Sequence, residues 1–284
     1  MGSKARVVVY ASEDPADAVG RAFAAIDGLD RTLSDYNPNS EARRLTAMPA
    51  GVWRDASPAL IDALEKSRAV WEASGGEFDV TIGAVSALWR GASAAGRRPT
   101  AEELGEARAC VGMTLVEIDR ERGRVRLARD GVIFDFGGIG KGIAADAAVA
   151  SLRADGLACA LVEIGGDLAA GEAPPGSVGW SVRVSDGGSE GAAVTVSNAG
   201  VATSGDAYRF TEIDGVRASH VIEPGTAQPT PEGGAVTVIA PAGWVADAVA
   251  TVGKLRGEAA AREAGRWLGG VRVIDPARLG ADTR

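Results

Sequence analysis

The chain has 284 residues, 46% of them hydrophobic, with a formal net charge of −8 and an isoelectric point near 4.9. A chain of this length and composition can bury a substantial core in one large domain, which argues against global disorder. Its acidic balance disfavours sequence-independent binding of DNA or RNA, because such binding depends on clustered lysine and arginine side chains. We therefore expect a folded domain with no nucleic acid partner.

The few histidine and cysteine residues restrict the metal sites that the chain can build. His220 is the single histidine, so a histidine cluster is excluded and any bound metal would be a hard ion on oxygen ligands. Cys110 and Cys159 lack the spacing of zinc ligands. We expect both cysteines to be buried thiols.

We expect neither a membrane-spanning segment nor a signal peptide within this sequence. Its apolar runs are too short to cross a bilayer, and charge returns soon after the first few apolar residues. We expect membrane association only through residues that are absent from this sequence.

The first half of the chain predicts mainly helices. A strand at residues 7–10 is followed by a helix that begins after the N-cap residue Asp14. A second helix begins after Ser57, and Thr100 with Glu103 forms a capping box for a third. Each of these helices carries apolar residues at helical spacing, which predicts one buried face.

The second half predicts mostly strands. They are expected at residues 125–127, 132–136, 159–164, 180–184, 194–196 and 236–239, separated by turns rich in glycine and proline. Two helices interrupt them, at about residues 141–154 and 243–253. Because helices and strands do not alternate regularly, this order predicts an α+β fold.

The stretch FDFGGIGKGIAADA, residues 134–147, joins a predicted strand to a predicted helix through four glycines and Lys141. It matches neither the Walker A loop, which needs a hydroxyl residue after the lysine, nor the dinucleotide fingerprint. Its glycines would still let the backbone approach a ligand, and the helix start would offer N–H groups to an anion. The alternative is an ordinary turn with a solvated lysine.

Two further turns carry glycine and aspartate: residues 165–167 follow the predicted strand at 159–164, and residues 203–206 follow a strand expected to end near Val201. Each alone is typical of an ordinary turn. Functional residues gather at the ends of strands, however, and three such turns in one chain indicate a site.

Asp247 and Thr251 stand one helical turn apart, so a carboxylate and a hydroxyl project from the same face. These oxygens suit part of a Mg²⁺ shell, which leaves room for water and a substrate phosphate. The alternative is a local role, in which the threonine bonds to a main-chain carbonyl. His220 is the side chain whose ordinary pKa suits proton transfer near neutral pH.

In chain order, these segments resemble the ApbE family of flavin transferases over the range from Met1 to about Leu255. The resemblance rests first on MGS at the start, LSDYNPNSEARRL at 33–45, GGEFDVTIGAVSALW at 75–89 and FDFGGIGKGIAAD at 134–146. The segments IGGD, TSGD, HVIEP and ADAVAT then follow in the family's order.

This resemblance implies an α+β, ApbE-like fold related to the T-fold. Residues 1–284 would form a single domain of two interlocked lobes around a flavin cleft, with the last ~25 residues peripheral. The activity would be Mg²⁺-dependent transfer of FMN from FAD to a serine or threonine hydroxyl of an acceptor protein, with release of AMP. The partners would be FAD and that acceptor protein.

The resemblance also assigns roles to individual residues. The metal ligands would be Gly138, through its carbonyl, Asp247 and Thr251. The catalytic groups would be His220, Asp206 and Lys141, with His220 or a nearby carboxylate as the base. The FAD-binding residues would be Met1, Tyr36, Glu77, Phe78, Asp79, Lys141, Gly166, Ser204, His220 and Ile222.

Three residues depart from the family pattern. Thr46 stands in place of an asparagine, Glu223 in place of an aspartate, and Ala227 in place of a glycine at which a positive φ is expected. The alternative function is an FAD-binding protein or FAD pyrophosphatase of the same fold. By resemblance the protein would act in the periplasm or cell envelope, with the cytoplasm as the alternative.

Overall fold

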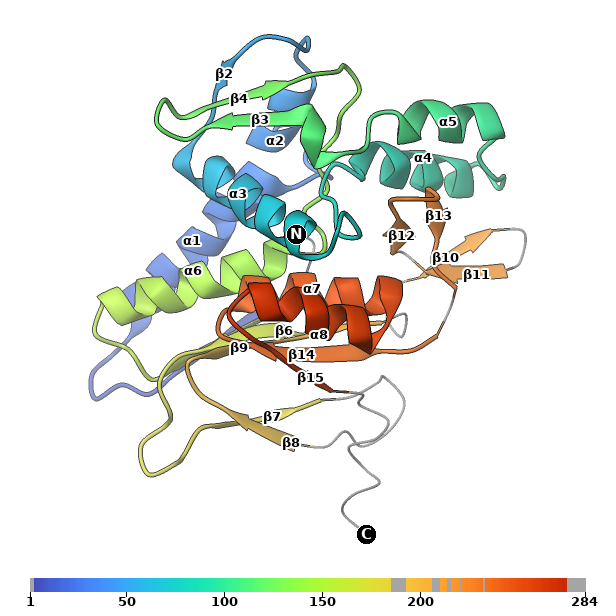
Figure 1. The fold of residues 1–284 in the computed structure, drawn as a ribbon. Coiled ribbons are helices and arrows are strands. Elements are labelled where there is room, and N and C mark those ends of the chain that lie inside the picture. The colour runs from blue at the N-terminus through green and yellow to red at the C-terminus, as the bar shows by residue number, and fades with distance from the viewer. Residues whose placement is uncertain are drawn as a thin grey trace. The chain divides into compact units, whose positions relative to one another are not determined.

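A computed structural model describes residues 3–184, 193–205, 210–213, 216–219, 221–231 and 233–274 (Figure 1). The chain divides into two compact units. The first comprises Met1–Leu29, Gly137–Ala207 and Gly234–Arg284, and the second comprises Asp30–Phe136 and Tyr208–Gly233. Helices and sheets occur in both, which confirms the predicted α+β class, whereas the single-domain organisation stays a prediction. Over the described ranges, no helix combines the length and apolarity needed to cross a membrane.

The first unit is built on an antiparallel sheet. Its strands, in spatial order, are β1 (Ala5–Val9), β5 (Ala160–Ile164), β6 (Asp167–Ala170), β9 (Ala199–Ser204), β14 (Val236–Ala240) and β15 (Arg272–Ile274). Antiparallel neighbours allow short connections, and β5 and β6 are joined directly by the Gly165-Gly166 turn, both of whose residues have positive φ.

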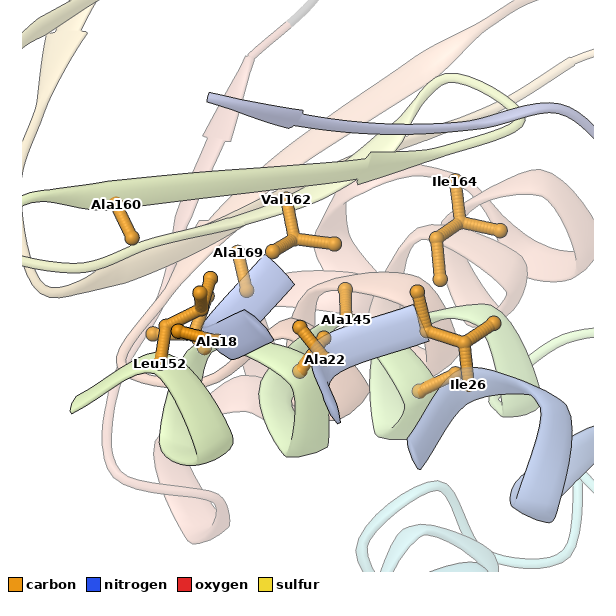
Figure 2. Close-up of a cluster of buried hydrophobic side chains, with 12 residues drawn as sticks. Ala18, Ala22, Ile26, Ala145, Leu152, Ala160, Val162, Ile164 and Ala169 are labelled. Atoms are coloured by element: carbon orange, nitrogen blue, oxygen red, sulfur yellow. The ribbon is translucent and has the colours of Figure 1, made fainter. Parts of the chain in front are cut away.

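Both faces of this sheet are buried. Helices α1 (Ala16–Leu33) and α6 (Gly140–Ala154) cover one face, where small alanines let them approach the strands closely (Figure 2). In β5, Val162 points into this helical layer, whereas its neighbour Leu161 belongs to the cluster on the opposite face. Alternation with a period of two therefore gives β5 an apolar residue for each face.

Two further layers complete the first unit. Helix α7 (Gly243–Arg256) packs beside α6 on the same side of the sheet, next to β9 and β14. Helix α8 (Glu258–Trp267) packs against α7 and β15. The hairpin of β7 (Trp180–Arg183) and β8 (Ala193–Val196) covers the opposite face. Figure 1 shows the helices and this hairpin on opposite sides of the sheet.

The start of α7 lies so close to β9 that only glycine fits between them. A Cβ placed on Gly200 would lie 2.4 Å from the Cα of Gly243, which is backbone and cannot rotate away. We expect Gly200→Ala to lower the free energy of unfolding by about 1 to 3 kcal/mol through overpacking. Urea unfolding followed by circular dichroism measures this change.

Gly20→Ala is the matched control, because Gly20 lies on the exposed side of α1 with open space around it. Alanine favours a helix over glycine by about 1 kcal/mol, so this control should be at least as stable as the unmodified protein. Equal stability of the two variants would contradict the close packing at Gly200.

The second unit holds the remaining elements. Its helices are α2 (Glu41–Thr46), α3 (Pro58–Ala73), α4 (Gly83–Ala94), α5 (Ala101–Arg108) and a 3₁₀ turn at Met113–Leu115. Its strands are β2 (Arg54–Asp55), β3 (Val116–Asp119) and β4 (Arg124–Leu127) in one sheet, and the hairpins β10 (Phe210–Ile213) with β11 (Val216–Ser219) and β12 (Ile222–Glu223) with β13 (Gln228–Pro229).

Two of the predicted helix starts are confirmed, whereas the first helix begins at Ala16, one residue later than an N-cap at Asp14 predicts. Ser57 accepts a hydrogen bond from the N–H of Leu60 at the start of α3, and Thr100 with Glu103 forms the capping box of α5. The predicted strand at 132–136 is wrong. Within the described ranges, residues 132–136 form a single β-bridge, between Ile133 and Ile82, and do not join a sheet. The Asp135 N–H instead donates a hydrogen bond to the carbonyl of Val80.

The two cysteines are free thiols in different units. Cys110 is buried, as predicted, whereas Cys159 is only half-buried, so the prediction of full burial is wrong for it. The Cys159 thiol lies 3.2 Å from the carbonyl oxygen of Ala173, which gives it a local structural contact.

The turn between β12 and β13 carries a strained alanine. Ala227 has a φ of 57°, which confirms the expected positive φ at this position. It is fully buried, and its carbonyl accepts a hydrogen bond from the indole N–H of Trp89 at 2.8 Å. The left-handed conformation costs an alanine about 1 to 2 kcal/mol, whereas glycine adopts it freely.

We expect Ala227→Gly to change the free energy of unfolding by between 0 and about +1 kcal/mol. The glycine removes the backbone strain of the positive φ, and this gain offsets the loss of one buried methyl group. Ala87→Gly, inside α4, should instead lose about 1 kcal/mol. Urea unfolding midpoints compare the two. A larger loss at Ala227 than at Ala87 would contradict the strain.

Candidate active site

The predicted phosphate loop does lead into a helix. Residues 137–139 form a turn, and α6 begins at Gly140, so Lys141 is the second helical residue. The N-cap residue of α6 is Ile139, whose side chain cannot accept a hydrogen bond, so this residue does not cap the helix. The first turn of α6 therefore presents N–H groups and the positive end of the helix dipole.

The Lys141 side chain turns toward two aspartates. Its ammonium forms an ion pair with Asp167 Oδ2 and another with Asp247 Oδ1 at 3.1 Å, and it lies 3.5 Å from the carbonyl oxygen of Gly137. The side chains of Lys141, Asp167 and Asp247 are 16%, 6% and 5% exposed. We call these three residues the lysine–aspartate cluster.

Both carboxylates of the lysine–aspartate cluster are also held by main-chain N–H groups. Asp167, the first residue of β6, accepts a hydrogen bond from Thr203 N–H at 3.2 Å. Asp247, on α7, accepts one from Gly142 N–H at 3.0 Å. The cluster thus joins a β-strand and two helices of the first unit.

The charges of the lysine–aspartate cluster are unbalanced, because two carboxylates face one ammonium group. Burial, and then the negative charge of Asp247, raise the pKa of Asp167 to about 7 against the opposing effect of Lys141. Burial alone would lower the pKa of Lys141, but the attraction of Asp247 and then Asp167 outweighs it and raises that pKa. The lysine is therefore charged at neutral pH. Above a pH of about 7, where Asp167 is ionised, the two carboxylates leave an excess of negative charge that suits a further cation.

The predicted metal ligands are only partly brought together. Thr251 donates its hydroxyl to the main-chain carbonyl of Asp247 at 3.2 Å, which is the local role considered for it from the sequence. Gly138 lies in the turn before α6, and no contact of its carbonyl with the lysine–aspartate cluster is seen in the described residues. In the described part of the chain, no three His, Cys, Asp or Glu side chains gather as a metal site.

Two more predicted residues flank the cluster. Gly166 immediately precedes Asp167, in the turn where a Cβ on Gly165 would lie 3.6 Å from Lys141 Cδ. Ser204 ends β9 and follows Thr203, whose N–H binds Asp167. Gly166 is thus adjacent in sequence to Asp167 of the cluster, and Ser204 is adjacent to the residue whose N–H binds Asp167.

The other described FAD-binding predictions lie in the second unit. Phe78 and Asp79 are buried, Glu77 and Ile222 are half-buried, and Tyr36 is 73% exposed. The ring centre of Tyr36 lies 4.8 Å from the guanidinium carbon of Arg90, which also pairs with Asp35 at 2.9 Å. Arg90 thus supports the ring of Tyr36 by a cation–π contact.

Asp79 has a structural role in this unit. It accepts hydrogen bonds from the N–H and hydroxyl of Thr81, at 2.8 and 2.6 Å, and from Met113 N–H at 3.0 Å. Burial raises the pKa of Asp79, and the bonds from Thr81 and Met113 oppose the rise. Its assignment to FAD binding stays a prediction.

Three predicted site residues, Met1, Asp206 and His220, lie outside the described residues. The sequence patterns do not identify Asp167 as a site residue, although they single out the turn that contains it. A carboxylate placed directly after a glycine pair at the end of an apolar strand was the signal for it. Its ion pair with Lys141 joins residues that only the folded sheet brings together.

Comparison with known proteins gives a consistent result. The sequence profile of the ApbE family matches residues 1–274. A protein of Klebsiella pneumoniae (strain 342) named FAD:protein FMN transferase is 31% identical over 259 residues, which cover 87% of this chain and 74% of that protein. A Treponema pallidum (strain Nichols) protein of the same name is 30% identical over 272 residues, covering 88% of this chain and 75% of that protein.

Solved structures agree with the sequence comparison. The apo form of the Pseudomonas stutzeri flavinyl transferase ApbE is 28% identical, with a TM-score of 0.77, and covers 95% of this chain and 90% of that chain. The ApbE protein of Thermotoga maritima is 26% identical, with a TM-score of 0.84, and covers 100% of this chain and 96% of that chain. From the profile, the relatives and the fold together, this chain belongs to the ApbE family.

Proposed function

We propose that the protein is a transferase that moves FMN from FAD to a serine or threonine hydroxyl of an acceptor protein and releases AMP. Membership of the ApbE family and the names of its relatives support the transfer of FMN from FAD to a protein. The observation that carries the proposal to this chain is the lysine–aspartate cluster at the start of α6.

The cluster suits a pyrophosphate substrate for two reasons. Once a bound cation offsets the two carboxylates, Lys141 and the helix dipole at the start of α6 would provide positive potential for phosphate oxygens. Phosphoryl transfer depends mainly on positioning and on neutralising charge in the transition state, which these groups supply. Asp167 holds Lys141 from the other side and so limits the directions in which the ammonium can point.

We also propose a magnesium ion held by Asp247, with the Thr251 hydroxyl and the Gly138 carbonyl as further ligands. The donor chemistry fits, because all three offer hard oxygen atoms and the Asp247 carboxylate already binds a cation, the Lys141 ammonium. When bound, the ion would withdraw charge from the phosphate oxygens. Mg²⁺ commonly takes only one or two protein carboxylates and completes its shell with water and substrate phosphate.

In the transfer step, the acceptor hydroxyl oxygen forms a bond to the phosphorus of the FMN half. The P–O bond to the bridging oxygen breaks, and AMP leaves with that oxygen and its electron pair. The hydroxyl proton passes to a base, for which we propose His220, with Asp206 as the carboxylate alternative. Lys141 stabilises the charge that develops on the phosphate oxygens.

We further propose that FAD contacts Met1, Tyr36, Glu77, Phe78, Asp79, Gly166, Ser204, His220 and Ile222. Among these, the exposed ring of Tyr36, held by Arg90, is suited to stacking on an aromatic ring. We propose action in the periplasm or cell envelope, which cell fractionation would test, with recovery in the cytoplasm as the contrary outcome.

The activity is tested by incubating the protein with FAD, Mg²⁺ and a candidate acceptor domain. In-gel flavin fluorescence and a mass gain of one FMN unit on the acceptor are expected, together with AMP detected by chromatography. FAD binding without label or AMP would reject the transferase. AMP and free FMN with every acceptor unlabelled would instead favour an FAD pyrophosphatase.

A further inference from the structure

Helices α6 and α7 both begin without an N-cap side chain of their own. Their N-cap residues are Ile139 and Ala242, whose side chains carry no hydrogen-bond acceptor, and neither makes a side-chain cap. The N–H groups in the first turn of a helix have no partner within the helix and need acceptors from elsewhere.

Each helix receives that acceptor from an aspartate of the other. Asp146, on α6, accepts hydrogen bonds from the N–H groups of Gly243 at 2.7 Å and Trp244 at 3.0 Å, the first two residues of α7. Asp247, on α7, accepts one from the N–H of Gly142 at 3.0 Å, in the first turn of α6. The two helices therefore cap each other.

The sequence pattern behind this arrangement occurs twice. Residues 142–146 read GIAAD and residues 243–247 read GWVAD, with the aspartate one turn after the glycine in both. The glycines allow the backbones to touch: a Cβ on Gly142 would lie 2.3 Å from the carbonyl oxygen of Gly243. The close approach brings each aspartate within reach of the other helix's first turn.

We infer that Asp146 is a positioning residue for the lysine–aspartate cluster. It holds the first turn of α7, one turn before Asp247, and so sets where that carboxylate meets Lys141 and the N–H of Gly142. The inference rests on the proposed function, in which Asp247 and Lys141 face the metal and the phosphates. Such sites lose function when the supporting groups let a ligand move by a fraction of an ångström to an ångström.

The first test needs neither metal nor FAD. Amide hydrogen exchange of Gly142, followed by NMR, reports whether Asp247 still covers that N–H. We expect Asp146→Ala to speed this exchange about 3- to 30-fold, the range for loss of a helix-capping acceptor. In Asp146→Asn, which keeps one acceptor oxygen, the exchange rate of Gly142 should lie between the rates in Asp146→Ala and in the unmodified protein.

An internal reference separates local loosening from a general loss of stability. Val162, in the buried sheet, exchanges through wider opening of the first unit. We expect Gly142 to gain exchange rate relative to Val162 in Asp146→Ala. Unchanged exchange at Gly142, or an equal rise at both amides, would overturn the inference.

The second test measures Mn²⁺ affinity of the full chain by electron paramagnetic resonance of the free ion. Loss of a group that orients a metal ligand typically weakens binding about 10- to 100-fold, and we expect this for Asp146→Ala. Ser57→Ala is the control, because it removes the N-cap of α3 in the second unit and leaves the cluster intact. An Asp146→Ala variant that binds Mn²⁺ as tightly as Ser57→Ala would also count against the inference.

Failure of the proposed function would look different. If the unmodified protein bound no Mn²⁺ and released no AMP from FAD, the proposed transfer would be rejected. The exchange of Gly142 relative to Val162 would still decide whether Asp146 positions Asp247.

Discussion

Replacing Lys141 with methionine is expected to lower the free energy of unfolding by about 3 to 5 kcal/mol at pH 8, the range for removing one partner of a buried ion pair. Methionine has a similar length but leaves Asp167 and Asp247 buried, close together and without a counter-charge. Chemical unfolding followed by circular dichroism measures the loss. Lys66→Met, which removes a partly exposed pair with Asp62, is the control and should lose about 1 kcal/mol or less.

The loss in Lys141→Met should depend on pH. The pKa of Asp167 is raised to about 7, above its ordinary value of 3.8, so the folded state holds this proton more tightly than the unfolded state. The resulting stabilisation is full below pH 4 and is lost as the pH rises through about 7. The charge of Lys141 opposes the rise in the pKa of Asp167. Without it, the loss in free energy of unfolding should be largest at pH 8 and should shrink toward pH 5. A deficit that is constant over this range would contradict the coupling.

Replacing Asp247 with asparagine is expected to slow FMN transfer by about 10²- to 10³-fold, the effect of losing one strong electrostatic contact to the transition state. The amide keeps the size of the side chain and one acceptor oxygen, but it loses the charge that would bind a metal ion. Asp167 still pairs with Lys141, so the folded state should be less affected than in Lys141→Met.

The measurement for Asp247→Asn is the initial rate of AMP release and of acceptor labelling at saturating FAD, over a Mg²⁺ titration. Asp62→Asn, at a partly exposed site on α3 in the second unit, is the control with the same chemical change. An unchanged rate for Asp247→Asn would reject this residue as a metal ligand. A rate restored by high Mg²⁺ would show that the lost charge acted through metal affinity.

Local features of the fold follow from the sequence. The cap of α3 by Ser57 and the capping box of α5 join residues three positions apart, so their pattern alone predicts them. Most strands of the first unit were predicted from short apolar runs bounded by turn residues, and in the structure their side chains alternate between two apolar clusters. Residues 132–136 have the same strand-like composition, but their hydrogen-bond partners lie in the chain near Val80, which no local pattern reveals.

The candidate site was predicted in part. Lys141 and Asp247 were identified from the sequence, and the structure brings them together with Asp167, which was not named as a site residue. The Asp247 carboxylate meets a lysine and an N–H group of α6, which are more than a hundred positions away in the chain. Contacts at such separations depend on which helix faces are apolar and on where glycines allow close packing.

The sequence by itself determined the α+β class, the helix starts of α3 and α5 and the left-handed position of Ala227, and it supplied the residue types of the proposed phosphate and metal site. Only the tertiary structure decided how α6 and α7, which lack caps of their own, are capped: Asp247 of α7 caps α6, and Asp146 of α6 caps α7. The reason is physical. A local cap is chosen by the backbone geometry of a few neighbouring residues, whereas a cap from another helix exists only after the sheet has packed both helices on one face.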